Sequence, residues 1–80
     1  MTTKTYRILT LLEKCPLTFG ELKRMTNIKE NVLNLLLYKL KKRNLIETKG
    51  RYLHYIYCLT PKGRIYLSEL KIKEVIDNVQ

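Results

Sequence analysis

Four stretches of this 80-residue chain carry apolar residues at the 3.6-residue period of an α-helix. The predicted helices span residues 4–14, about 19–25, 30–43 and about 61–78. Pro16 ends the first helix, because the residue before a proline avoids the α region. Thr18 and Glu21 have the spacing of a capping box at the start of the second helix, and Thr60 with Pro61 begins the last.

The inward faces of the two middle helices follow from the same period. Phe19, Leu22 and Met25 are expected to face inward from the second helix. The third helix carries a stripe of leucines at one face: Leu33, Leu36, Leu37 and Leu40. Asn44 follows at the position where a helix often ends in the left-handed conformation.

Two strands are expected between the third and fourth helices, over residues 45–48 and 53–59, with a tight turn at Lys49, Gly50 and Arg51. Residues 15–18 are expected to form only a short extended link. The order helix, helix, helix, hairpin, helix is that of a winged helix-turn-helix domain. We therefore predict one domain over residues 1–80, mainly α with a small β-hairpin: three helices, a two-stranded wing and a C-terminal helix.

The residues themselves resemble winged-helix regulators of the multiple-antibiotic-resistance (MarR) and arsenical-resistance (ArsR) types. The resemblance covers roughly residues 5–70 and is carried by two stretches, 17–46 and 57–64. Its most specific motif is a Tyr-x-Leu-Thr-x-x-Gly-Arg pattern, formed here by Tyr57, Leu59, Thr60, Gly63 and Arg64. The small size and the richness in Ile, Lys and Tyr also resemble winged-helix regulators of archaeal viruses and plasmids. The chain departs from the family pattern at Lys29, where a Ser or Thr usually caps the third helix, and at Asn44, where the turn usually has Gly.

The charge of the chain is uneven along its length. With 16 Lys and Arg against 7 Asp and Glu, the net charge is +9, and residues 39–59 alone contribute +5. A surface that only keeps a protein in solution usually mixes the two signs, so a one-signed stretch favours a polyanionic partner, most simply nucleic acid. Anionic lipid and plain solubility remain alternative explanations.

The outward face of the third helix is the candidate for DNA recognition. With a rotation of 100° per residue, four residues fall on the outward side of the third helix or at its edge, away from the buried stripe. These residues are expected to contact the bases: Asn31, Asn34, Leu35 and Tyr38. Asn pairs well with adenine and Leu can contact a thymine methyl group, so an A·T-leaning site is expected. Contacts to the DNA backbone are expected from six cations on the helix and wing: Lys29, Lys39, Lys42, Arg43, Lys49 and Arg51. The alternative is an ordinary solvated helix face beside a charged hairpin turn.

The last helix has a second apolar side that nothing within the chain obviously covers. We expect this side and part of the first helix to form a homodimer interface, as the resemblance also implies. The expected interface residues are Tyr6, Leu11, Ile65, Ile72, Val75, Ile76 and Val79. The alternative is that the C-terminal residues fold back or fray.

Several kinds of site find no support in the sequence. One histidine, no Gly-rich phosphate loop and no paired Cys–His spacing argue against an enzyme, a metal centre or a cofactor. Cys15 and Cys58 are too few for a disulfide framework, although they could still pair. The chain contains no apolar run of the length that crosses a bilayer and no signal-peptide pattern, so a cytoplasmic protein is expected. No small-molecule ligand is evident.

The expected function is sequence-specific binding of double-stranded DNA by a homodimeric transcriptional regulator. Two alternatives stay open, because one fold can host different uses: a winged-helix module that binds protein, and a nonspecific architectural nucleic-acid binder.

Overall fold

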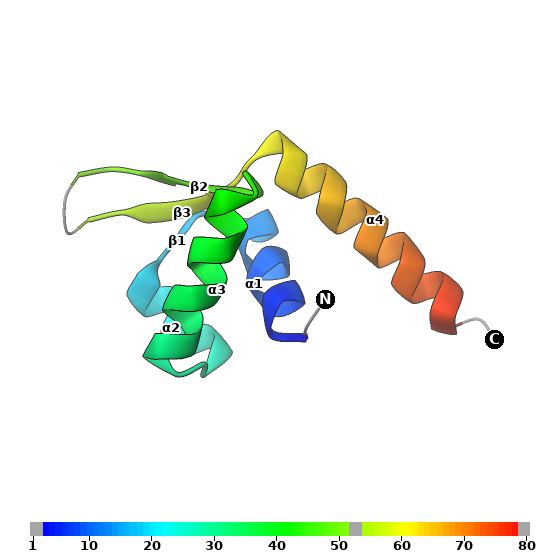
Figure 1. Ribbon diagram of the computed structural model, residues 1–80, viewed down its shortest axis with the longest axis horizontal. Helices are drawn as coiled ribbons and strands as arrows, with labels where there is room; N and C mark the ends of the chain where they lie inside the picture. The colour runs from blue at the N-terminus through cyan, green and yellow to red at the C-terminus, as the bar shows by residue number, and fades with distance from the viewer. Residues whose placement is uncertain (1–2, 52–53, 79–80) are drawn as a thin grey trace.

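The computed structural model describes residues 3–51 and 54–78, with side chains up to residue 73. All four expected helices are present: α1 (Thr3–Lys14), α2 (Phe19–Thr26), α3 (Glu30–Lys42) and α4 (Pro61–Asn78). Three strands accompany them: β1 (Leu17–Thr18), β2 (Ile46–Lys49) and β3 (Ile56–Leu59). Helices α1 to α3 gather against the sheet, the wing extends to one side, and α4 leaves the body on the other (Figure 1).

The sheet has one strand more than the two that were expected. Its order is β1-β3-β2, and both neighbouring pairs are antiparallel. Leu17 lies opposite Tyr57 and Thr18 opposite Ile56, so the predicted extended link is an edge strand. Two residues of strand carry no periodicity of their own, and the pairing partner lies about forty residues away, so the sequence pattern could not show it.

The predicted turn at residues 49–51 is wrong. Lys49 is still in the ladder, opposite Ile56, and the backbone N–H of His54 donates to the carbonyl of Arg51 over 2.8 Å. The chain therefore reverses beyond Gly50. Gly50 has φ of +107°, and a Cβ there would lie 2.5 Å from the carbonyl oxygen of His54, so glycine is needed just inside the reversal.

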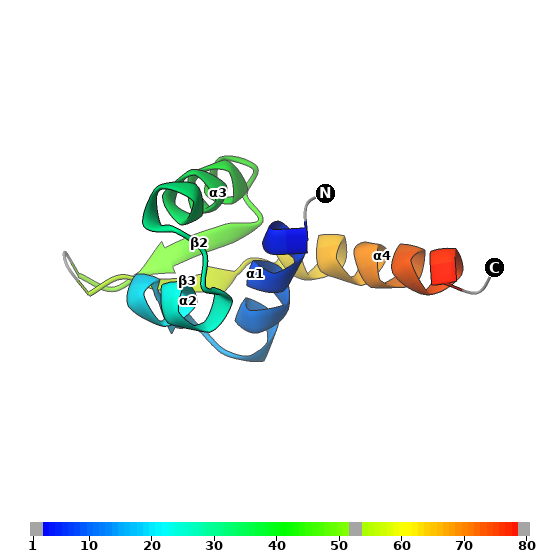
Figure 2. The same cartoon turned by 90° about the horizontal axis from the view of Figure 1, so that it is seen from below.

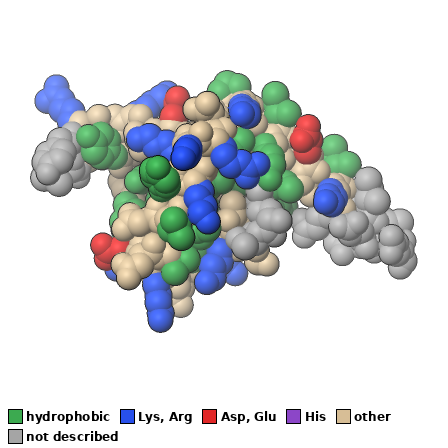
Figure 3. Space-filling view, in the orientation of Figure 1, with side chains coloured by type: hydrophobic (Ala, Val, Ile, Leu, Met, Phe, Trp, Pro, Cys, Tyr) green, Lys and Arg blue, Asp and Glu red, His purple; other side chains and the backbone are tan. Residues whose placement is uncertain are grey.

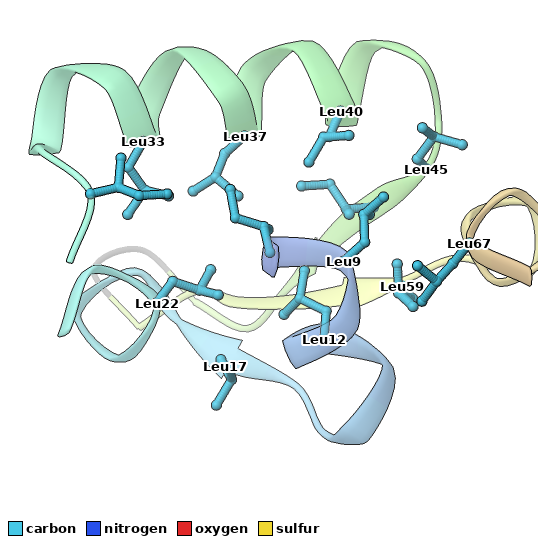
Figure 4. Close-up of a cluster of buried hydrophobic side chains, with 13 residues drawn as sticks. Leu9, Leu12, Leu17, Leu22, Leu33, Leu37, Leu40, Leu45, Leu59 and Leu67 are labelled. Atoms are coloured by element: carbon cyan, nitrogen blue, oxygen red, sulfur yellow. The ribbon is translucent and has the colours of Figure 1, made fainter. Parts of the chain in front are cut away.

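The core forms where the three N-terminal helices, the sheet and the start of α4 meet (Figure 4). Its buried apolar members come from every helix: Ile8, Leu9, Leu12, Leu17, Leu22, Ile28, Leu33, Leu37, Leu40, Leu45, Ile46, Leu59 and Leu67. The inward expectation for Met25 is wrong, because its side chain is 51% exposed. Leu22 and Thr26, four residues apart, face the core instead, and the Thr26 hydroxyl donates to the Leu22 carbonyl over 2.6 Å.

Both predicted threonine caps are present. The hydroxyl of Thr18 accepts the N–H of Glu21 and the Glu21 carboxylate accepts the N–H of Thr18, at 3.2 and 3.0 Å. This second hydrogen bond lowers the pKa of Glu21 below its usual range. At the start of α4, Thr60 accepts the N–H of Gly63 over 2.9 Å and donates to the carbonyl of Asn44 over 2.6 Å.

The first turn of α4 is held tightly against the end of α3. Asn44 has φ of +63°, as the sequence predicts for a helix end. The backbone N–H of Thr60 donates to the Leu45 carbonyl over 3.1 Å, and Gly63 lies so close that a Cβ would overlap this carbonyl. Farther along α4, Lys71 donates to Glu13 of α1 over 2.6 Å, which raises the pKa of Lys71.

The crowding at Gly63 predicts opposite effects of one substitution at two glycines. Gly63→Ala should lower the free energy of unfolding by about 1–3 kcal/mol, because backbone atoms must move apart. Gly20→Ala is the matched control: Gly20 lies in α2, and a Cβ there would have nothing within 4 Å, so stability should rise by up to ~1 kcal/mol. Urea unfolding followed by circular dichroism measures both, and equal effects at the two sites would contradict the close approach.

Candidate nucleic-acid interface

Helix α3 stands out from the body on one face of the domain (Figure 2). Its Leu33, Leu37 and Leu40 side chains are buried, which turns the opposite side of the helix to solvent. All four residues expected to contact bases are exposed on α3: Asn31, Asn34, Leu35 and Tyr38. Leu35 is 51% and Tyr38 62% exposed, so two large apolar side chains lie in water beside two amides.

Cations surround this exposed face of α3. Figure 3 shows Lys and Arg side chains over α3 and at the end of the wing, with few carboxylates among them. Lys29, Lys39 and Lys42 are exposed, as are Lys49 and Arg51 on the wing. The Nζ atom of Lys49 lies 3.6 Å from a carboxylate oxygen of Glu47, and both side chains are about half in solvent or more, so this pair holds Lys49 only weakly.

Arg43 has an intramolecular partner that the sequence did not indicate. Its guanidinium carbon lies 5.0 Å from the centre of the Tyr66 ring in α4, a cation–π geometry. Arg43 is exposed and can still approach a phosphate, but it also joins the end of α3 to α4. Tyr66 is half-buried against the core, so packing holds in place the ring that Arg43 contacts.

The two described tyrosines of the wing region, Tyr55 and Tyr57, differ in burial. Tyr57 packs against the core, and its burial raises the pKa of the phenol. Tyr55 is 45% exposed. Tyr52 lies outside the described residues.

Sequence reasoning missed a second group of cations, on α2 and the turn after it. A hollow of about 450 Å³ is lined by Gly20, Lys23, Arg24, Asn27, Ile28 and Lys29. Only Lys29 was expected to contact DNA. The signal was available in principle, because Lys23 and Arg24 fall on the outer side of α2 once Leu22 and Thr26 are placed inside.

The residues expected to form a dimer interface divide into three groups. Ile65 and Ile72 are 63% and 61% exposed, and their seven-residue spacing puts them on one side of α4, away from buried Leu67. Tyr6 and Leu11, also expected at the interface, are half-buried against the core of the same chain. The side chains of Val75 and Ile76, and all of Val79, lie outside the described residues.

Other chemistry is sparse in the part of the chain that the structure describes. Within it, no three His, Cys, Asp or Glu side chains come together as metal ligands would. Cys15 is exposed, Cys58 is half-buried, and both are free thiols. No described helix has the length and apolar character needed to span a membrane.

The geometry has counterparts among solved structures. A probable transcriptional regulator from Pseudomonas aeruginosa superposes with a TM-score of 0.81, at 23% identity over 96% of this chain and 62% of its own. BpsR from Bordetella bronchiseptica, whose DNA binding is regulated by 6-hydroxynicotinic acid, gives 0.77 at 24% identity over 99% of this chain and 59% of its own. AF1382 from Archaeoglobus fulgidus gives 0.77 at 19% identity, over all of this chain and 91% of its own.

This chain has a winged helix-turn-helix fold. Its structural neighbours include a probable transcriptional regulator, so the fold that the resemblance implied is confirmed. The winged-helix chain spans about three fifths of the length of the first two neighbours named. No protein-family model matches it, and no curated protein matches it in sequence.

The start of α3 has a lysine where a capping residue would stabilise the helix. Lys29 is the N-cap, in an extended conformation with φ of −60° and ψ of 145°, and its side chain makes no capping hydrogen bond. Lys29→Ser should raise the free energy of unfolding by about 1 kcal/mol, because serine caps the helix and a cation leaves its positive end.

The control is Lys29→Ala, which removes the charge without supplying a cap. Its free energy of unfolding, measured by urea unfolding, should rise clearly less than that of the serine variant. If the two variants were equally stable, the missing cap would not be a source of instability.

Proposed function

We propose that this chain binds double-stranded DNA inside the cell as a homodimer and regulates transcription. The observation that carries the proposal is the exposed face of α3, where Asn31, Asn34, Leu35 and Tyr38 lie together. Helix α3 would enter the major groove, where amides can pair with adenine and apolar groups can contact thymine. Two structural neighbours, one a probable transcriptional regulator and the other a protein with regulated DNA binding, favour this use of the fold.

The cations would hold the backbone while α3 contacts the bases. Lys39 and Lys42 flank the exposed face along α3, and Lys49 and Arg51 extend along the wing, within reach of neighbouring phosphates or the minor groove. Arg43 would add a backbone contact while remaining on Tyr66. Phosphate contacts release counterions, so binding should weaken steeply with salt.

Selection of bound duplexes from a random pool tests the proposal. The enriched sequences should share an A·T-leaning motif with two-fold symmetry and half-sites about 34 Å apart. Asn31→Ala should relax the base preference at one position per half-site and weaken the free energy of binding to the selected site by about 1–3 kcal/mol. The double variant Lys49→Gln/Arg51→Gln should weaken binding to all duplexes alike. It should also reduce the slope of log K against log salt by about 0.9 per lost contact.

The outcomes separate the candidate functions. Equal affinity for all duplexes of one length would leave an architectural binder and would contradict sequence readout. No measurable affinity for duplex DNA at low salt would contradict the proposal altogether and favour a protein-binding module.

The dimer is proposed to form through the outer side of α4. Ile65 and Ile72 expose two large apolar side chains directly opposite the side that Leu67 buries, and a second copy would cover them. A two-fold dimer would also present two copies of α3 to one duplex.

Charge placed on this side of α4 should separate the protomers. Ile72→Glu should shift the protein from dimer to monomer in sedimentation equilibrium and weaken binding to a two-half-site duplex much more than to a single half-site. Lys73→Glu, on an exposed neighbouring position, is the control and should leave the dimer intact. A dimer that survives Ile72→Glu together with Ile65→Glu would place the interface elsewhere.

A further inference from the structure

The hollow beside the turn between α2 and α3 is a concave surface lined by cations. Its six lining residues include Lys23, Arg24 and Lys29 but no carboxylate. Gly20 forms part of the wall, with open space where a side chain would begin, and buried Ile28 lies at the turn. The hollow is therefore open, small and positively charged, which suits a tetrahedral anion.

The cations of the hollow are only lightly engaged by the protein. Arg24 makes no hydrogen bond or ion pair that the structure describes. The carboxylate of Glu21 already accepts the N–H of Thr18, which lowers the pKa of Glu21, and the charge of Arg24 helps to lower it further. Arg24 can therefore offer its planar set of donors to a phosphate, a geometry that favours two parallel hydrogen bonds. Lys23 reaches Glu30 at 3.4 Å, with the two side chains 49% and 61% exposed, so this pair is weak and exchangeable.

We propose that this hollow binds a phosphodiester group of duplex DNA beside the N-terminal end of α3, and that Glu30 restrains this binding through its pair with Lys23. The inference rests on the proposed DNA-binding function. The hollow adjoins α3 directly, because Lys29 lines the hollow and immediately precedes the helix that carries Asn31. The wing follows the other end of α3, so backbone contacts would hold the recognition helix at both ends.

The position of Glu30 has two opposite effects at the start of α3. Glu30 lies in the first turn of α3, where a negative charge favours the helix. The same charge next to the hollow opposes a phosphate and occupies Lys23. When the phosphate binds, Lys23 would exchange the Glu30 carboxylate for it, so that removing the acid should strengthen DNA binding.

Two single-charge variants with matched controls test the inference. Arg24→Gln should weaken duplex binding roughly ten-fold at low salt and reduce the slope of log K against log salt by about 0.9 per contact. Its control is Lys14→Gln, an exposed position in the last turn of α1. The C-terminal end of α1 lies on the side of the domain away from α3 (Figure 2). The control should leave affinity and slope nearly unchanged.

The second variant works in the opposite direction, which a folding defect cannot imitate. Glu30→Gln should tighten binding several-fold, and more than Glu69→Gln, an equal loss of negative charge on α4. The gain should be clearly smaller in a Lys23→Gln background, because Glu30 acts in part through its pair with Lys23.

The results distinguish failure of the inference from failure of the proposed function. If the unaltered protein binds no duplex, the proposed DNA-binding function is wrong, and the inference that rests on it is wrong as well. If it binds, but Arg24→Gln matches Lys14→Gln or Glu30→Gln matches Glu69→Gln, the hollow is not a backbone site although the function stands. Saturable binding of inorganic phosphate that depends on Arg24 and does not compete with duplex would assign the hollow to a free anion and overturn the inference.

Discussion

Burial of one side of α3 is the constraint on which the rest of the structure depends. Leu33, Leu37 and Leu40 have almost no exposed surface, and each faces side chains from the other helices and the sheet. At about 25 cal/mol per Å² of apolar surface, leucines of this kind supply a large share of the stability of so small a domain. A rotation of α3 about its axis would expose them, so their burial also determines which residues face outward. The outward position of Asn34 and Leu35 is thus a consequence of packing.

The segment after α3 extends this constraint to the last helix. Asn44 turns the chain in the left-handed conformation, and the carbonyls of Asn44 and Leu45 accept the hydroxyl and the N–H of Thr60. Gly63 lets the first turn of α4 approach that backbone, and Arg43 adds a contact with Tyr66. Helix α4 is therefore oriented by the same residues that end α3. A partner bound along α4 would be placed at a defined angle to the recognition helix, which is the requirement for two such helices to meet one duplex.

The features predicted correctly from the sequence are those that depend on neighbours within a turn or two. The helix period, the capping box at Thr18, the cap at Thr60 and the left-handed Asn44 are all local, and all are present. Apart from the inward position of Met25, which is exposed, the errors involve contacts beyond a turn or two of helix. Strand β1 exists only because β3 is beside it, the wing reverses beyond Gly50 because the ladder extends to Lys49, and Arg43 contacts a ring 23 positions later. The hollow was missed for the same reason, since Gly20 and Lys29 become neighbours only when the turn at Asn27 has formed.

The cations around α3 do not all carry the same weight as signs of function. Lys39, Lys41 and Lys42 lie in the last turn of the helix, where positive charge is favourable for the helix dipole even without DNA. A structural explanation is sufficient for them. Lys29 is different, because a cation at the N-terminal end opposes the dipole and replaces a residue that could cap the helix. Glu30 returns a negative charge to the first turn of α3, but its carboxylate also pairs with Lys23, and the side chain of Lys29 makes no capping hydrogen bond. A phosphate beside the turn would add a further negative charge at this end. The positive charge at the least favourable end of α3 is therefore the stronger structural argument for a polyanionic partner.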